Sequence, residues 1–211
     1  MLKMSVSNQQ IAIAGKVLEG ESEKTISGAI VEIIAMPEKF KTQLSLKALQ
    51  YGSQWERMLE RPDRKITTSD GDFHFINLPP GEYLLETFLP TSATRYKNGR
   101  KTVTVSAVDG KILTTMTEIV LLPTGIKGKI TDADEPNKAI INAKVQIQGS
   151  RDSTLSDQKG NYRLLGLESS KSGEHTVTLT VSAIGYQQVS QSVVIQLGEV
   201  IAEQNFSLKH K

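Results

Sequence analysis

The sequence predicts an all-β protein that consists of two tandem β-sandwiches, the first of which carries a long and partly helical insertion. Short runs rich in β-branched residues alternate apolar and polar side chains, which is the period of a half-buried strand. Clusters of Gly, Pro and Asp separate these runs, as turns do. The order of strands and turns in the first half then occurs again in the second half, with about seven short strands in each.

The strands of the first copy follow one another with turn signals between them. Residues 11–18 and 26–34 are β-branched runs on either side of an acidic turn. An Asp-Gly pair at 70–71 supplies the next turn, because Gly tolerates positive φ and Asp bonds to its own backbone. Phe73 and Phe75 then alternate with polar residues in a strand that a Pro-Pro-Gly corner ends. The remaining strands of this copy are expected at 83–85, 101–105 and 118–122.

The second half of the chain repeats this order after a break at residues 123–125. The matching segments are Gly128-Lys129-Ile130 with Gly15-Lys16-Val17, 142–147 with 28–33, 160–167 with 71–78, and 173–177 with 81–85. We therefore expect a tail at residues 1–8, a first sandwich at 9–123 with an insertion at 36–65, and a second sandwich at 124–211.

The order Gly-x-Val, Gly-Ala-x-Val and Asp-Gly-x-Phe-x-Phe-x-x-Leu-Pro-Pro-Gly-x-Tyr resembles the carboxypeptidase regulatory-like family, also called transthyretin-like or prealbumin-like. The resemblance covers both copies, although the second copy lacks the Pro-Pro-Gly corner. It implies seven-stranded Greek-key sandwiches that bind, space or brace, while activity belongs to neighbouring domains. The insertion is also similar to small sandwich proteins of the phage-tail-like contractile injection apparatus of bacteria.

The sequence contains no motif of a catalytic, cofactor-binding or metal-binding site. The chain has no Cys and three His, so carboxylates alone would have to hold a metal. It has no Gly-x-Ser-x-Gly, no phosphate-binding glycine loop and no closely spaced nucleophile and base. The signatures of zinc carboxypeptidases and hydroxyisourate hydrolases, which are enzymes near this fold, are also missing. We therefore expect no enzyme, no cofactor and no small-molecule substrate.

Composition excludes two further classes of protein. A net charge of +2 in 211 residues is too small to indicate a nucleic-acid partner. No run approaches the roughly 18 apolar residues of a membrane span, and the N-terminal residues lack the apolar core of a signal peptide. We expect a protein that is cytoplasmic as synthesised and that leaves the cell only as part of an exported assembly.

Three features have both a structural and a functional interpretation. Residues 132–137 offer oxygen ligands at alternating positions, which suits either a Ca²⁺ loop or a solvated acidic hairpin. Lys129 and Asn205 suit an isopeptide bond of the kind found in related pilin-type sandwiches, although no acidic partner is identifiable. His175 stands where the first copy has Tyr83, and packing in the core is its expected role.

The insertion at 36–65 is the segment that the repeat does not explain. Its apolar residues recur at spacings of four and three, as on one face of an amphipathic helix: Leu44, Ala48, Tyr51, Trp55 and either Met58 or Leu59. Gly52 interrupts the pattern. This face folds back onto the sandwich as a lid, docks a protein partner or lines a ligand groove. Docking is considered because Trp, Tyr and Arg dominate interface hot spots. Residues 95–101 add a basic hairpin with an Asn-Gly turn.

These two surfaces supply the candidate partner-binding residues, which are Leu44, Tyr51, Trp55, Arg57, Met58, Arg95, Tyr96, Lys97 and Arg100. The predicted function is that of a non-catalytic structural protein, a subunit or decoration of a larger protein assembly such as a contractile injection apparatus. The alternative is a carbohydrate- or cell-surface-binding accessory module that uses exposed aromatic side chains.

Overall fold

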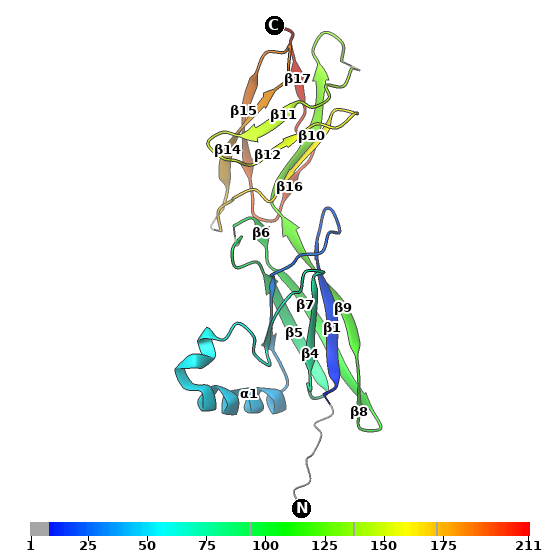
Figure 1. Cartoon of the computed structure of the whole chain (residues 1–211), viewed down its shortest axis with the longest axis vertical. Coiled ribbons are helices and arrows are strands. Elements are labelled where there is room, and N and C mark those ends of the chain that lie inside the picture. The colour runs from blue at the N-terminus through cyan, green and yellow to red at the C-terminus, as the bar shows by residue number, and fades with distance from the viewer. Residues whose placement is uncertain (1–8, 93, 137, 172) are drawn as a thin grey trace, which may run out of the picture. The chain divides into compact units, whose positions relative to one another are not determined.

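The computed structural model describes residues 9–92, 94–136, 138–171 and 173–211 (Figure 1). The predicted tail at 1–8 lies outside this part of the chain. Strands dominate the described residues, and α1 is their one α-helix, so the predicted all-β sandwich class is confirmed. Within the same residues, no helix is long and apolar enough to cross a membrane.

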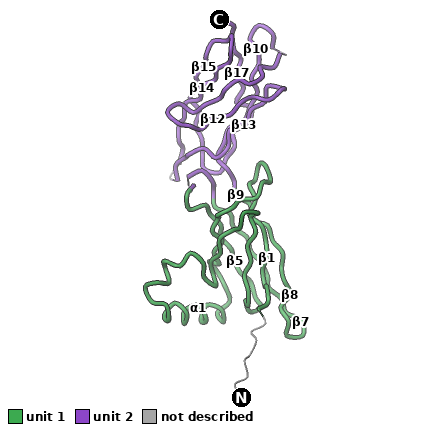
Figure 2. Tube along the Cα trace, in the orientation of Figure 1, with its two compact units in different colours: residues 1–91, 98–121 green, residues 92–97, 122–211 purple. Residues whose placement is uncertain are grey.

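The chain forms two compact units (Figure 2). The first unit contains the described part of residues 1–91 together with 98–121, and the second contains 92–97 with 122–211. The short strand β6 (Tyr96–Lys97) goes with the second unit because it pairs with Pro123 and Leu122, at the end of β9 (Thr115–Pro123). The sequence predicts one boundary, after residue 123, whereas the chain passes between the units three times.

The first unit consists of two sheets. Its strands are β1 (Ile11–Glu19), β2 (Ile30–Ala35), β3 (Arg64–Ile66), β4 (Asp72–Ile76), β5 (Gly81–Phe88), β7 (Gly99–Val108), β8 (Lys111–Leu113) and most of β9. One sheet has the order β4-β1-β9, and the other has the order β3-β2-β5-β7-β8. Alternate residues of its longer strands point inward and are buried, as the period of two requires, and they include Ile13, Phe75, Tyr83, Leu85 and Ile119.

The second unit repeats this arrangement. Its strands are β10 (Gly125–Asp132), β11 (Lys144–Ile147), β12 (Ser153–Leu155), β13 (Asn161–Leu165), β14 (His175–Ser182), β15 (Val189–Ile195), β16 (Val200–Ile201) and β17 (Phe206–Leu208). One sheet pairs β13, β10 and β16, with β17 also on β10, and the other has the order β12-β11-β14-β15. Its core cluster includes Ile130, Val145, Tyr162, Leu179 and Phe206.

A glycine at the same place in both copies explains why the Gly-Lys pair recurs. A Cβ on Gly15 would lie 2.3 Å from the carbonyl oxygen of Thr117, and a Cβ on Gly128 would lie 2.0 Å from that of Gln204. Any side chain would therefore push the first strand of each sandwich away from its last. The register that the sequence repeat predicts agrees with the structure at this position.

The Pro-Pro-Gly corner of the first unit lies against the start of the insertion. Tyr83 is fully buried and donates a hydrogen bond from its hydroxyl to the carbonyl oxygen of Pro79, at 2.7 Å. Gly81 has a φ of 146°, and a Cβ there would lie 2.4 Å from the ring of Pro37. The corner therefore fixes the point at which the chain leaves the sandwich for the insertion.

Candidate protein-docking site

The insertion contains the α-helix α1 (Glu38–Tyr51) followed by the 3₁₀ helix η1 (Gly52–Arg57). In Figure 1 they stand out from the strands of the first unit as a lobe of their own. Leu, Lys, Ala, Gln and Glu fill most of α1, and all of them favour the helix. Gly52 ends it with a φ of 54°, as the sequence predicts. Arg64 and Lys65, the last two residues of the predicted insertion, belong to strand β3.

Two buried aromatic rings hold the insertion to the sandwich. Phe40 is the one buried residue of α1 and packs edge-on against Tyr83, with 6.0 Å between the ring centroids. Trp55 is buried in η1, with 7% of its surface exposed. The guanidinium of Arg61 lies 5.1 Å from the centroid of its ring, within the range of a cation–π contact. One side of the insertion thus folds back as a lid.

Arg61 joins this lid to the sheet through carboxylates. Its guanidinium donates to both oxygens of Asp63 at 3.1 Å, and to Glu32 on strand β2 at 3.2 Å. Glu56 on η1 accepts a third contact at 3.4 Å. Arg64 on β3 also pairs with Glu32. Because Arg61 and Asp63 are buried, this network of charged hydrogen bonds holds the end of the insertion against β2 and β3.

A groove of 460 Å³ lies along the inner side of the insertion. Its apolar lining comes from the insertion and from the end of β4: Phe40, Leu44, Tyr51, Trp55, Met58, Pro62 and Ile76. Its polar lining consists of Gln9, Gln43, Lys47, Glu60, Arg61, Lys65 and Asn77. An apolar groove with a polar rim of this volume falls within the roughly 300–1,000 Å³ of typical binding sites.

The outer side of the insertion is apolar as well, which the helical pattern did not predict. Leu46, Leu49 and Leu59 have 63%, 79% and 67% of their surface exposed. Leu46 and Leu49 lie off the stripe of apolar residues at spacings of four and three, so the pattern identified the inner face alone. A helical wheel would have placed these two leucines on the opposite face and thereby provided the missing signal.

Four of the five predicted candidates on the insertion line this groove, but not all of them are accessible. Trp55 is buried, and Leu44 and Met58 are half-buried in the groove wall. Tyr51 is 45% exposed and its ring lies 6.1 Å from that of Trp55. Arg57 is exposed, with no partner among the described residues. The face therefore has a packed base and an open rim.

The basic hairpin predicted at 95–101 does not form. The chain runs from β6 into β7 without reversing at Asn98 and Gly99, and neither residue has positive φ. Tyr96 and Lys97 instead pair with the end of β9 in the second unit, whereas Arg100 lies on β7 in the first. Pairing with β9 is favoured because it adds β6 to an existing sheet, whereas an isolated two-stranded hairpin is only marginally stable.

The cations of this segment have acidic partners close by. Arg95 donates to Asp152 at 2.9 Å, to Glu168 at 3.0 Å and to the carbonyl oxygen of Gly166. Arg100 donates to Glu86 at 2.7 Å. The predicted positive surface is thus neutralised locally for these two arginines.

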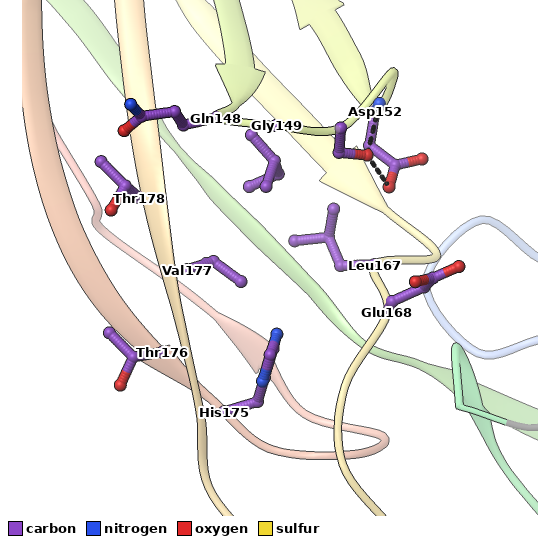
Figure 3. A pocket seen from close by; sticks show the side chains of 11 residues that line it. Gln148, Gly149, Asp152, Leu167, Glu168, His175, Thr176, Val177 and Thr178 are labelled. Carbon is purple, nitrogen blue, oxygen red and sulfur yellow. Dashed lines mark hydrogen bonds between the residues drawn. The ribbon is translucent and has the colours of Figure 1, made fainter.

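The second unit contains a smaller cavity of 340 Å³ between the end of β11 and the start of β14 (Figure 3). Leu167 and Val177 face each other across it, with Asp152 and Glu168 to one side. Burial by itself raises the pKa of Asp152, but the hydrogen bonds from Arg95 and Ser150, together with the charge of Arg95, outweigh it, and the pKa lies below its ordinary value. Both carboxylates are engaged by Arg95, so the cavity presents no free acid–base pair.

His175 lies at the rim of this cavity and is exposed, so the prediction that it packs in the core is wrong. It shares a strand face with Val177 and Leu179, which are buried. It is, however, the first residue of β14, and burial on this strand begins only at Val177. Alternation predicted its face correctly but not the point at which the core ends.

The loop at 132–137 uses its first carboxylate internally. Asp132 is fully buried, and one of its oxygens accepts the backbone N–H groups of Asp134 at 2.9 Å and Glu135 at 3.3 Å. The other oxygen accepts the Tyr186 hydroxyl at 2.9 Å and lies 3.0 Å from Nε2 of His210. Asn137 lies outside the described residues, and the residues that are described contain no group of three or more His, Cys, Asp or Glu suited to a metal.

Lys129 and Asn205 meet, but not through the lysine amine. The backbone N–H of Lys129 donates to Oδ1 of Asn205 at 2.8 Å. Both residues are exposed. The side chain of Asn205 serves as a hydrogen-bond acceptor for β10, just before β17 begins.

A search of curated proteins found no match to the chain, whereas several solved structures are similar to it. Among solved structures, the Bacillus anthracis TIE protein is similar at 16% identity and a TM-score of 0.36, over 95% of this chain and 34% of that one. The Streptococcal ancillary pilin is similar at 15% identity and a TM-score of 0.34, over 98% of this chain and 64% of that one. The shaft pilin SpaA from Lactobacillus rhamnosus GG is similar at 12% identity and a TM-score of 0.40, over 96% of this chain and 97% of that one. The chain thus spans about a third of the first protein and about two thirds of the second.

These matches change one expectation and leave another without support. The predicted cytoplasmic location is wrong on this finding, because the matched proteins include pilins. No match of those named here involves a contractile injection apparatus. A family model, described as the CarboxypepD_reg-like domain, matches residues 126–211. The resemblance to carboxypeptidase regulatory-like domains is therefore confirmed for nearly all of the second sandwich.

Proposed function

We propose that the protein is a non-catalytic subunit of a larger protein assembly and that the insertion of its first sandwich is the docking surface. The observation that carries this proposal is the exposure of Leu46, Leu49 and Leu59 on a segment whose other side is anchored. Burying apolar surface against a partner contributes about 25 cal/mol per Å². Three large apolar side chains on one short segment are therefore a strong driving force for association.

The anchoring of the insertion supports the same proposal. Phe40, Trp55 and the Arg61 network hold the segment in place before any partner arrives. A surface that is already ordered loses little conformational entropy on binding, so more of the contact energy appears as affinity. The lid and the docking surface are thus two sides of one element.

The proposal concerns protein assemblies as a class. The comparisons give no support to a phage-tail-like contractile injection apparatus, so the proposal is confined to a protein assembly. A carbohydrate-binding module would need an exposed aromatic platform. Among the described aromatic residues, Tyr51 alone is well exposed, so no observation favours that alternative.

A double substitution tests the proposal. In Leu46→Gln with Leu49→Gln, Gln keeps the helix propensity of Leu and removes the apolar surface. Ile184→Gln in the second unit is the control, because Ile184 is fully exposed and lies far from the insertion in the sequence. We expect a protein that co-purifies with the wild-type chain and with the control to be lost from the double variant, while the circular dichroism spectrum stays unchanged. Retention of that protein by the double variant would refute the proposal.

A further inference from the structure

We propose that the segment which binds the insertion is an acidic stretch of protein with large apolar side chains, and that those side chains enter the groove beside Trp55. This inference rests on the proposed function, extends the docking surface from the exposed leucines to the groove on the inner side of the insertion, and specifies the chemistry of the partner. It follows from the distribution of charge on the insertion, from the pairing of those charges and from their position relative to the groove.

The insertion is more basic than the chain to which it belongs. Residues 36–65 contain seven Lys and Arg but four Asp and Glu, whereas the whole chain carries a net charge of +2. The remainder of the chain is therefore slightly acidic. A local excess of one charge on an exposed element attracts partners of the opposite charge and speeds their encounter.

All four acidic residues of the insertion are already engaged. Glu38 pairs with Lys41 at 3.3 Å and Glu60 with Lys65 at 3.7 Å, while Glu56 and Asp63 both contact Arg61. Three cations are left over, namely Lys39, Lys47 and Arg57, which have no partner among the described residues. Carboxylates from outside would complete the pairing that the insertion leaves open.

The free cations lie beside the apolar surface. Lys47 lines the groove together with Leu44 and Tyr51, and in the sequence it stands between the exposed Leu46 and Leu49. Arg57 follows the buried Trp55 by two residues and ends η1. An apolar groove with cations at its rim fits side chains such as Leu or Phe flanked by Asp or Glu.

Nucleic acid would fit this arrangement less well. A phosphate backbone favours a run of cations, and its bases stack on exposed aromatic rings. Here three free cations are interspersed with leucines, and Trp55 is buried. Apolar contacts would supply most of the affinity, and the cations would set orientation, encounter rate and salt dependence.

A displayed library of random peptides, selected on the full chain, tests the proposal. We expect selected peptides to be rich in Asp or Glu together with Leu, Phe or Met. The sole Trp of the chain lies in the groove wall, so titration of each synthesised peptide should change the fluorescence of Trp55. A selection that yields no binder, or binders that are basic or lack large apolar residues, would overturn the proposal.

Charge reversal supplies the second arm of the test. Lys47→Glu with Arg57→Glu should weaken binding of the selected peptides by about tenfold at low salt, and by less as salt rises. Lys111→Glu, on β8 in the same unit, is the control and should bind as the wild type does. A random single-stranded oligonucleotide that displaces the peptides would point to nucleic acid instead. If the Lys47→Glu with Arg57→Glu variant binds the peptides as tightly as the wild type, while co-purification still depends on Leu46 and Leu49, the acidic partner is refuted and the proposed function stands.

Discussion

Arg61 shows how much of the insertion depends on a single side chain. It is buried, contacts the face of Trp55 and donates to carboxylates on η1, on β2 and in the connection before β3. The cost of burying a guanidinium is offset by bonds in a fixed fork geometry that suits carboxylates. Removal of Arg61 would leave Asp63 and Glu32 short of a partner in a site with little solvent.

Arg61→Ala should therefore destabilise the protein by about 3–5 kcal/mol, the typical result of breaking a buried ion pair from one side. Urea unfolding followed by circular dichroism measures this change, and Trp55 fluorescence should report a loosened insertion in the absence of denaturant. Glu56→Gln is the matched control, because Glu56 is 81% exposed in its side chain and should contribute less than about 1 kcal/mol. Equal effects of the two substitutions would contradict the role given to Arg61.

Asp132 gives the second unit a dependence on pH. Burial by itself raises the pKa of this carboxyl, but hydrogen bonds from the backbone N–H of Asp134, the Tyr186 hydroxyl and the backbone N–H of Glu135, together with the nearby His210, outweigh it and hold the pKa well below its ordinary value. Lys138 and His210 also face the carboxylate, at 3.5 and 3.0 Å. The charged form is thus the one that the fold stabilises.

The sign of the effect follows from linkage. A carboxyl whose pKa is lower in the folded state contributes stability above its unfolded pKa of about 3.9, and that stability is lost as pH falls below this value. We expect Asp132→Asn to lower the melting temperature at neutral pH, with a difference from wild type that shrinks below about pH 4. Thermal melts of the full chain between neutral and acidic pH measure it. A constant difference across that range would contradict the assignment.

At the scale of elements, the sequence predicted the strands well because each strand has its own local signal. Alternation located β4 from Phe73 and Phe75, and the repeat located β13 from its copy. The helix end at Gly52 was predictable for the same reason. The predicted hairpin at 95–101 failed because β6 forms against β9, a partner about 25 residues further along the chain, which no local pattern encodes.

The candidate site was predicted in part for a related reason. Helical periodicity identified the inner face of the insertion, with Leu44 and Trp55 among its residues. It did not identify Arg61, whose partner Glu32 is distant in the sequence, or the exposed leucines on the opposite face. Which of two apolar faces is buried depends on where the helix docks, and docking is a property of the folded chain.

The close approach of the first and last strands of each sandwich at Gly15 and Gly128 leads to a prediction about stability. Ala in place of Gly15 or Gly128 would place a methyl group against a backbone carbonyl, and the backbone can move little within a sheet. We expect either substitution to cost at least the roughly 1–3 kcal/mol of an overpacked core. Gly28→Ala and Gly149→Ala are controls, since both positions have positive φ but open space for a Cβ. Their cost should be about 1 kcal/mol in denaturant unfolding, and a larger cost there than at Gly15 would contradict the packing argument.

At the scale of the whole molecule, stability comes from two separate cores without disulfide bonds. The chain has no Cys, and each unit surrounds its own set of buried apolar residues. Long insertions are tolerated in such a scaffold because they add little loop-closure entropy, about 0.6 kcal/mol for each doubling in length. The fold therefore tolerates a long insertion in one copy and a short connection at the same place in the other.

A cross-link between Lys129 and Asn205 can be tested directly, and we expect none. The structure uses the amide of Asn205 and the backbone of Lys129, so the lysine side chain should be dispensable. Asn205→Ala should cost about 0.5–1.5 kcal/mol, the net contribution of one hydrogen bond, whereas Lys129→Gln should leave the unfolding curve unchanged. The intact mass should equal that of the sequence. Loss of one ammonia from the mass, together with equal destabilisation by both substitutions, would instead show an isopeptide bond, because a cross-link needs both side chains.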